Sequence, residues 1–125
     1  MNNDILGRDD LYLIVNEFYK ELLIHKDMKH FFEKFDDNNK LEKHLQILVD
    51  FWDNILFYSG AYKKNAMQPH INLHLTKPFE AHHFEIWLTL FNKAVDDHFK
   101  GENAHTIKTR ALSIATIMRI KTINS

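Results

Sequence analysis

The sequence predicts an all-α fold in a single domain that spans residues 1–125. Glycine occurs only three times and proline twice, so few residues interrupt long helices. Two long stretches, 41–58 and 80–99, repeat apolar residues at the i, i+3, i+4, i+7 spacing of one helix face. No stretch is typical of a strand. We therefore expect helices joined by connections of a few residues around one core.

The first helix is expected over about 9–24, with Asp9 or Asp10 as its N-cap. A short helical turn should follow, capped by Asp27, and a polar turn at 36–39 should separate it from the next helix. The apolar face of the first helix comprises Leu11, Ile14, Val15, Phe18 and Leu22.

The helix over 41–58 carries the strongest apolar stripe, and Ser59-Gly60 should end it. A loop is expected over 61–65 and a short helix around 66–73, before Thr76-Lys77-Pro78 interrupts the chain again.

The next helix is expected over 80–99, and Lys100-Gly101 should stop it. Asn103 or Thr106 should begin the last helix. Its buried stripe is expected to comprise Ile107, Ala111, Ile114, Ala115 and Met118, widened by Leu112, Ile117 and Ile120.

Composition excludes several classes of function. The net charge of -1 gives no electrostatic reason to bind nucleic acid or an anionic membrane. The absence of cysteine rules out disulfides, thiolate metal sites and cysteine nucleophiles. No apolar run approaches the ~20 residues that span a bilayer, and the polar start Met-Asn-Asn-Asp lacks a signal-peptide pattern. We therefore expect a soluble, cytoplasmic protein, with no nucleophile elbow or phosphate loop.

Two histidines are the first candidate ligands of a metal. His70 and His74 are four residues apart after Pro69, so on a helix both imidazoles share one face. They can be idle surface residues, or they can bind zinc with further ligands. His82 and His83 could add ligands, but adjacent residues on a helix point in different directions.

Three polar side chains stand on otherwise apolar helix faces. His44 interrupts the stripe of 41–58, and Tyr19 and Trp87 lie on the apolar sides of the helices expected over 9–24 and 80–99. A buried imidazole, phenol or indole needs a hydrogen-bond partner. Singly, each is more often a core residue than a site residue. Together with a ligand histidine, they are what a small all-α protein needs to hold haem.

These residues, in this order, resemble the truncated haemoglobins, and within them the third group. The resemblance extends from about Val15 to Met118. It rests on Phe18-Tyr19, on His44 followed by Phe51-Trp52, on Tyr62 eight residues before His70, and on Phe84-Glu85-Ile86-Trp87-Leu88. It implies a two-over-two helical sandwich around haem b (iron protoporphyrin IX).

The resemblance also implies roles for individual residues. His70 would be the proximal iron ligand, with His74 as the alternative, because the spacing to Trp87 is longer than the family pattern. If His70 binds iron, His74 could reach a haem propionate. Tyr19, His44 and Trp87 would face the bound gas from the distal side. The remaining haem contacts are expected to be Phe32, Leu48, Phe51, Trp52, Met67 and Phe91.

The implied function is binding of O2, NO or CO at a pentacoordinate-capable iron, with a polar pocket that holds oxygen tightly. One alternative is a haem enzyme with NO dioxygenase or peroxidase activity, which would need a separate reductase because the chain has no flavin or nicotinamide motif. A second is a non-haem helical protein with zinc at His70 and His74. We expect a monomer that binds neither nucleic acid nor membrane.

Overall fold

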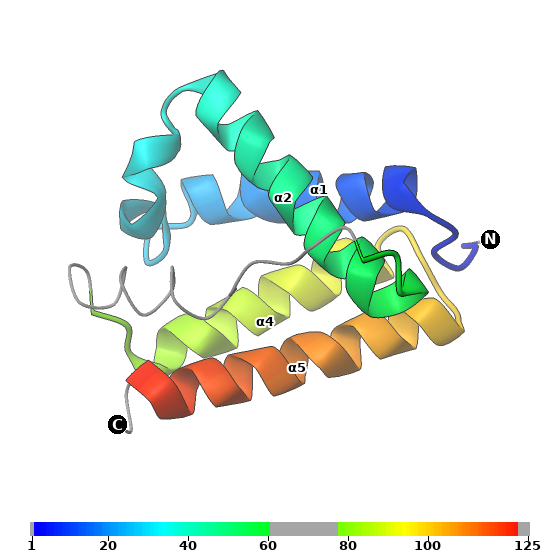
Figure 1. Ribbon diagram of the computed structural model, residues 1–125. Coiled ribbons are helices and arrows are strands. Elements are labelled where there is room, and N and C mark those ends of the chain that lie inside the picture. The colour runs from blue at the N-terminus through cyan, green and yellow to red at the C-terminus, as the bar shows by residue number, and fades with distance from the viewer. Residues whose placement is uncertain (1, 61–77, 123–125) are drawn as a thin grey trace.

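The described helices form two pairs: in one pair the two helices cross at an angle, and in the other they lie side by side and antiparallel (Figure 1). The structure is a computed structural model, and it describes residues 2–60 and 78–122. Helices α1 (Arg8–Ile24) and α2 (Asn38–Phe57) form one pair, linked by the 3-10 segment η1 (Lys29–Phe35). Helices α4 (Ala81–Asp96) and α5 (Glu102–Thr122) form the other pair. The described residues contain no strand, only an isolated bridge between Asn3 and Phe99.

Helix α1 follows the predicted pattern, and Leu11, Ile14, Val15, Phe18 and Leu22 are all buried. The expected cap is wrong. Gly7 is the N-cap residue, and Asp9 and Asp10 lie inside the first turn, where negative charge suits the helix dipole. The Asp10 carboxylate accepts a hydrogen bond from the Leu6 amide at 2.8 Å instead.

The short turn forms as η1, but Asp27 does not cap it. Met28 is its N-cap residue, and no side chain makes a capping bond there. Helix α2 begins three residues earlier than expected, because the Asp37 side chain accepts the Asn39 amide at 2.8 Å. It ends at Phe57, and the C-cap residue Tyr58, with a left-handed φ of 55°, turns the chain before Ser59-Gly60.

Helix α4 ends at Asp96, earlier than expected, and residues 97 and 98 form a turn before the bridge at Phe99. Helix α5 begins one residue before the expected Asn103. Its cap comes from the far end of the chain: the Asp4 carboxylate accepts the amides of Asn103 and Ala104, both at 2.9 Å. This bond pattern ties the N-terminal segment to the turn between the two helices.

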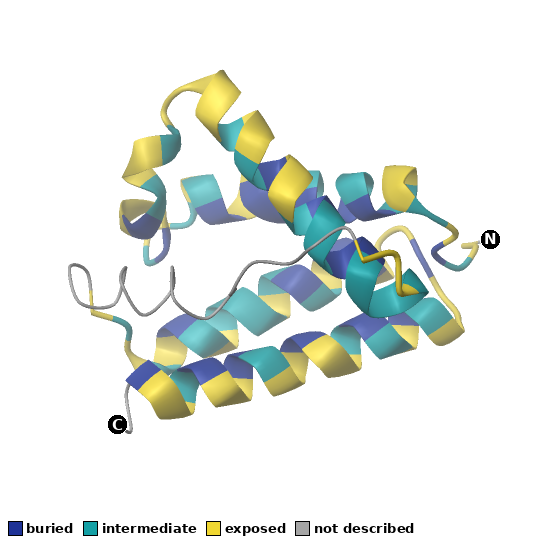
Figure 2. Ribbon diagram, in the orientation of Figure 1, coloured by how far each residue is buried: buried dark blue, intermediate teal, exposed yellow. Residues whose placement is uncertain are grey.

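Helix α5 buries a single narrow stripe against α4 (Figure 2). Ile107, Ala111, Ala115 and Met118 are buried, as predicted, and Ile114 is half-buried. The prediction that three further residues widen this buried stripe is wrong: Leu112, Ile117 and Ile120 are 55%, 44% and 54% exposed. Within the described ranges, α5 packs against its neighbours through one face only, and these three residues lie on its other side.

The core lies between the two helix pairs, and aromatic rings fill it. Phe91 is at its centre, 1% exposed. Its ring stacks on Trp52 at 5.3 Å and on Trp87 at 5.6 Å between centroids, and meets Phe18 edge-on at 5.2 Å. These contacts join α1, α2 and α4, and they hold Trp87 in a defined orientation for the pocket described below.

The expected loop over 61–65, the short helix around 66–73 and the break at Thr76-Lys77 lie outside the described residues. No helix in the described ranges is both long and apolar enough to cross a membrane.

Candidate functional site

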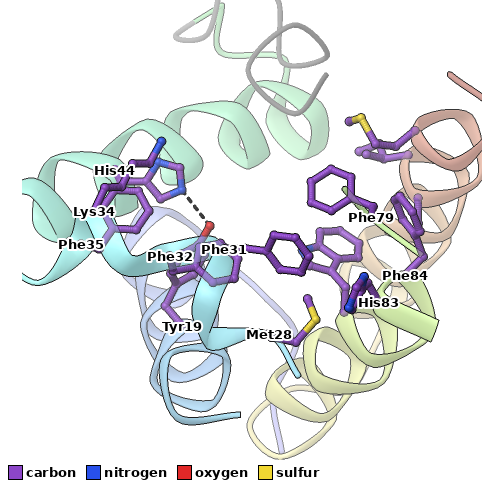
Figure 3. A pocket seen from close by; sticks show the side chains of 14 residues that line it. Tyr19, Met28, Phe31, Phe32, Lys34, Phe35, His44, Phe79, His83 and Phe84 are labelled. Atoms are coloured by element: carbon purple, nitrogen blue, oxygen red, sulfur yellow. Dashed lines mark hydrogen bonds between the residues drawn. The ribbon is translucent and has the colours of Figure 1, made fainter. Parts of the chain in front are cut away.

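The candidate site is a pocket between η1, α2 and the α4–α5 pair (Figure 3). Aromatic and apolar side chains form most of its wall. The described lining residues are Tyr19, Met28, Phe31, Phe32, Lys34, Phe35, His44, Phe79, His83, Phe84, Trp87, Ile114, Ala115 and Met118.

Three separate helices bring the predicted distal residues to this one pocket. Tyr19 comes from α1, His44 from α2 and Trp87 from α4. The Tyr19 hydroxyl and His44 Nε2 are 2.7 Å apart, which is a short hydrogen bond (Figure 3). Each of the three residues carries one polar group on an apolar side chain, so the pocket can orient a small polar ligand without many charges.

Tyr19 keeps its proton. Its side chain is 7% exposed, and burial raises the pKa of the phenol well above its usual value of 10. Its ring meets Phe32 edge-on at 5.4 Å and Phe35 at 6.3 Å between centroids. The aromatic residues of η1 therefore fix the ring, and the neutral O–H remains available as a donor.

Two aromatic rings hold the imidazole of His44 in place. Its ring stacks on Phe35 at 4.7 Å between centroids and meets Tyr19 edge-on at 5.2 Å. The stripe position that looked anomalous in the sequence thus has two ring contacts and a hydrogen bond to the phenol.

The six predicted haem contacts fall into four groups. Phe32 lines the pocket. Trp52 and Phe91 are buried in the core behind Trp87, and neither is among the described lining residues. Leu48 and Phe51 are half-buried and pack against the core from α2. Met67, together with both candidate iron ligands, His70 and His74, lies outside the described residues.

Ten of the described lining residues were not predicted from the sequence as haem contacts or distal residues, although His83 was considered as a metal ligand and Phe84 belongs to a quoted motif. Phe31 and Phe35 lie in the predicted short turn, and Ile114, Ala115 and Met118 belong to the predicted stripe of the last helix, so residue type and periodicity could have indicated both groups. The other five, which only the packing of separate segments assembles, are Met28, Lys34, Phe79, His83 and Phe84.

Lys34 and His83 add the remaining ionisable groups of the described wall. The Lys34 ammonium lies 5.2 Å from the centroid of the Phe35 ring and lines the pocket. His83 is 8% exposed. Burial, followed by the neighbouring His82 and His30, lowers the pKa of its imidazole below the usual 6.5.

The pocket has the composition that haem requires. A porphyrin is a flat apolar ring with two carboxylates at one edge, and the described wall offers aromatic and methionine side chains together with one lysine. The lining also includes three side chains with a polar group, Tyr19, His44 and Trp87. The described residues therefore fit the prosthetic group.

Comparisons with known proteins agree with this geometry. A family model described as bacterial-like globin matches residues 2–121. The group 3 truncated hemoglobin of Campylobacter jejuni is 25% identical over 118 residues, which cover 93% of this chain and 91% of the relative. The crystal structure of the group III truncated hemoglobin from that organism matches with a TM-score of 0.88 at 23% identity, and covers 98% of this chain and 95% of the other. The predicted all-α truncated-globin fold is confirmed.

Proposed function

Because this chain belongs to the bacterial-like globin family, we propose that it holds haem b in the pocket of Tyr19, His44 and Trp87 and binds O2, NO or CO there. The family implies binding of small gaseous ligands through haem. The observation that carries the proposal is the convergence of these three polar side chains, from three helices, on one apolar pocket.

His70 is the proposed proximal ligand, and His74 is the alternative. Phe32 forms part of the wall directly, and Trp52 and Phe91 support it from behind Trp87. Leu48, Phe51 and Met67 complete the proposed haem contacts.

Lys34 is the proposed partner of a haem propionate. It is the only lysine or arginine among the described lining residues. The Lys34 ammonium lies over the Phe35 ring, and its flexible stem would let it reach a carboxylate at the pocket edge.

When bound, haem supplies an iron atom that takes diatomic gases. The protein contributes the hydrogen bonds around that ligand. Tyr19 has a single proton, so it can donate either to His44 or to a ligand in the pocket. We propose that His44 carries its proton on Nε2 and donates it to the Tyr19 oxygen. The Tyr19 hydroxyl is then free to donate into the pocket, and Trp87 Nε1–H adds a second donor.

This arrangement should slow oxygen release. A hydrogen bond in a dry pocket contributes roughly 1–3 kcal/mol, which corresponds to about ten- to hundredfold in the dissociation rate. His44 is in this scheme a positioning residue for Tyr19, because its Nε2 contacts the phenol oxygen.

Enzymatic turnover is a second candidate function. Donors from Tyr19 and Trp87, with His44 positioning Tyr19, can polarise an O–O bond, which favours NO dioxygenation or peroxide reduction over simple transport. Mixing the oxygenated protein with NO in a stopped-flow instrument, with a reductant present, separates the two. Rapid formation of nitrate with repeated turnover supports the enzyme, and slow displacement of oxygen by NO supports a binding protein.

An absorption spectrum of the purified protein tests the haem proposal itself. A Soret band that shifts on reduction and on addition of CO supports it. A colourless protein that cannot be loaded with haem would contradict it and would favour zinc at His70 and His74. We further propose that the chain is one domain, acts as a monomer in the cytoplasm and receives electrons from a separate reductase.

A further inference from the structure

Three histidines gather where η1 meets the beginning of α4. The rings of His82 and His83 are 4.1 Å apart and those of His30 and His83 are 5.9 Å apart between centroids. His82 and His30 are exposed, whereas His83 is buried and lines the pocket. The proposed gas-binding chemistry uses none of the three.

His83 and Glu80 form a reciprocal capping box at the start of α4. The Glu80 side chain accepts the His83 amide, and His83 Nδ1 accepts the Glu80 amide at 2.8 Å. Since Nδ1 uses its lone pair as an acceptor, the neutral ring carries its proton on Nε2. One hydrogen bond thus fixes both the helix N-terminus and the tautomer of the histidine.

Protonation of His83 is incompatible with this bond. An imidazolium has a proton on both nitrogens, so Nδ1–H would face the Glu80 N–H, donor against donor. The positive charge would also lie at the positive end of the α4 dipole and beside His30 and His82. Two carboxylates oppose these effects, those of Glu80 and of Asp27.

The same ring belongs to the pocket wall. Phe31 of η1 meets His83 edge-on at 4.8 Å and Phe79 at 4.9 Å between centroids, and Phe79 meets Phe84 at 5.6 Å. All four residues line the pocket. Movement of the first turn of α4 would therefore change the wall that η1 and α4 build together.

A metal ion suits this cluster less well than a proton does. Ligand atoms of Glu80, His82 and His83 lie within 4.8 Å of one another. A metal on His83 Nδ1 would have to displace the Glu80 amide, and a metal on Nε2 would require a proton on Nδ1, opposite that amide. The helix dipole also disfavours a cation at this end.

We propose that His83 is a pH-sensitive latch: uptake of a proton by its imidazole breaks the hydrogen bond with the Glu80 amide, releases the first turn of α4 and loosens the pocket wall formed by Phe31, Phe79, His83 and Phe84. The latch closes at neutral pH and opens in mild acid. It is built from described residues alone and does not require haem, so its failure is distinct from failure of the haem proposal.

The decisive measurement is an NMR titration of the His83 ring nitrogens and the Glu80 amide, in the protein as purified, from pH 8 to pH 5. We expect His83 to be in the Nε2–H form at pH 8, and the Glu80 amide signal to move with His83 protonation below pH 6.5. A ring that carries its proton on Nδ1 at pH 8, or a Glu80 amide that does not follow the titration, overturns the proposal without any variant.

His83→Gln is the matched variant, because glutamine at this position can accept the same amide but cannot titrate. At pH 5 we expect the Glu80 amide to exchange with solvent at least about fivefold faster in the wild type than in His83→Gln, and at pH 8 equally fast. His82→Gln, on the exposed neighbour, should leave the acid-induced acceleration in place. Equal exchange rates in wild type and His83→Gln at pH 5 contradict the latch.

Discussion

The Tyr19 hydroxyl and His44 Nε2 are 2.7 Å apart, and this bond joins α1 to α2 at the edge of the pocket. The same two rings pack against Phe35 of η1, so three elements determine their positions. The phenol is therefore held where its O–H can donate to a ligand in the pocket.

Replacing Tyr19 with phenylalanine should speed oxygen dissociation at least severalfold, because the variant loses the donor but keeps the ring. Stopped-flow displacement of oxygen by carbon monoxide measures the rate. Tyr12→Phe is the matched control, since the Tyr12 hydroxyl donates to Glu42 at 2.8 Å on the surface. An unchanged rate in Tyr19→Phe would remove this residue from the proposed hydrogen bonds.

Alanine substitutions at His70 and His74 should separate the two candidate iron ligands. We expect His70→Ala to lose the spectrum of five-coordinate ferrous haem and His74→Ala to retain it, because only the proximal imidazole bonds iron. Absorption and resonance Raman spectra of the reduced proteins make the comparison. The reverse outcome would assign the iron to His74.

Lys34→Gln should increase the rate at which haem is lost to a scavenging protein, by about two- to tenfold, because a propionate loses its cationic partner. The loss should also become less sensitive to salt. Lys29→Gln provides the control, since Lys29 is exposed and is not among the described lining residues. Equal rates in the two variants would argue against a role for Lys34.

Gly101→Ala should destabilise the fold by about 1–3 kcal/mol. Gly101 has a φ of 151°, and an added Cβ would lie 2.5 Å from Asp4 Cγ, so both the backbone and the cap of α5 must shift. Gly7→Ala should cost less, since φ there is 179° and no heavy atom lies within 4 Å of the added Cβ. Urea unfolding of both variants compares the free energies of unfolding.

The Asp4 cap should make stability depend on pH in the acid range. Burial by itself raises the pKa of this carboxyl, but hydrogen bonds from four backbone amides outweigh that effect, and the pKa lies below its usual 3.8. A group with a lowered pKa stabilises the fold fully above pH 3.8 and loses this contribution as pH falls through the folded pKa. Asp4→Asn should therefore be less stable than the wild type at pH 6.

Urea unfolding at several pH values tests the direction of this pH dependence. The difference between wild type and Asp4→Asn should shrink as pH falls below 3.8. A difference that stays constant between pH 6 and pH 3 would mean that the carboxylate charge does not stabilise the cap.

Periodicity and residue type were sufficient to predict the all-α class, the approximate extent of the long helices, the buried face of α1 and the central part of the buried stripe of α5. They also singled out Tyr19, His44 and Trp87, because a polar group on an apolar helix face can be recognised from the sequence alone. Local patterns suffice for such features, since each helix buries one face wherever its partners are.

Helix ends were less predictable, because the capping group can come from anywhere in the chain. Asp9 and Asp27 have suitable side chains at suitable positions, yet neither caps a helix. The α5 cap comes from Asp4, about a hundred residues away in the chain, and no local pattern in the sequence indicates that contact.

The sequence by itself determined the helical class, the globin resemblance and which polar residues lie on apolar faces. Only the tertiary structure decided that the Tyr19 hydroxyl meets His44, that Trp52 and Phe91 lie behind Trp87, and that His83 joins the helix cap to the pocket wall. The reason is physical: helix periodicity is a property of neighbouring residues, whereas a pocket exists only once helices far apart in the chain pack together.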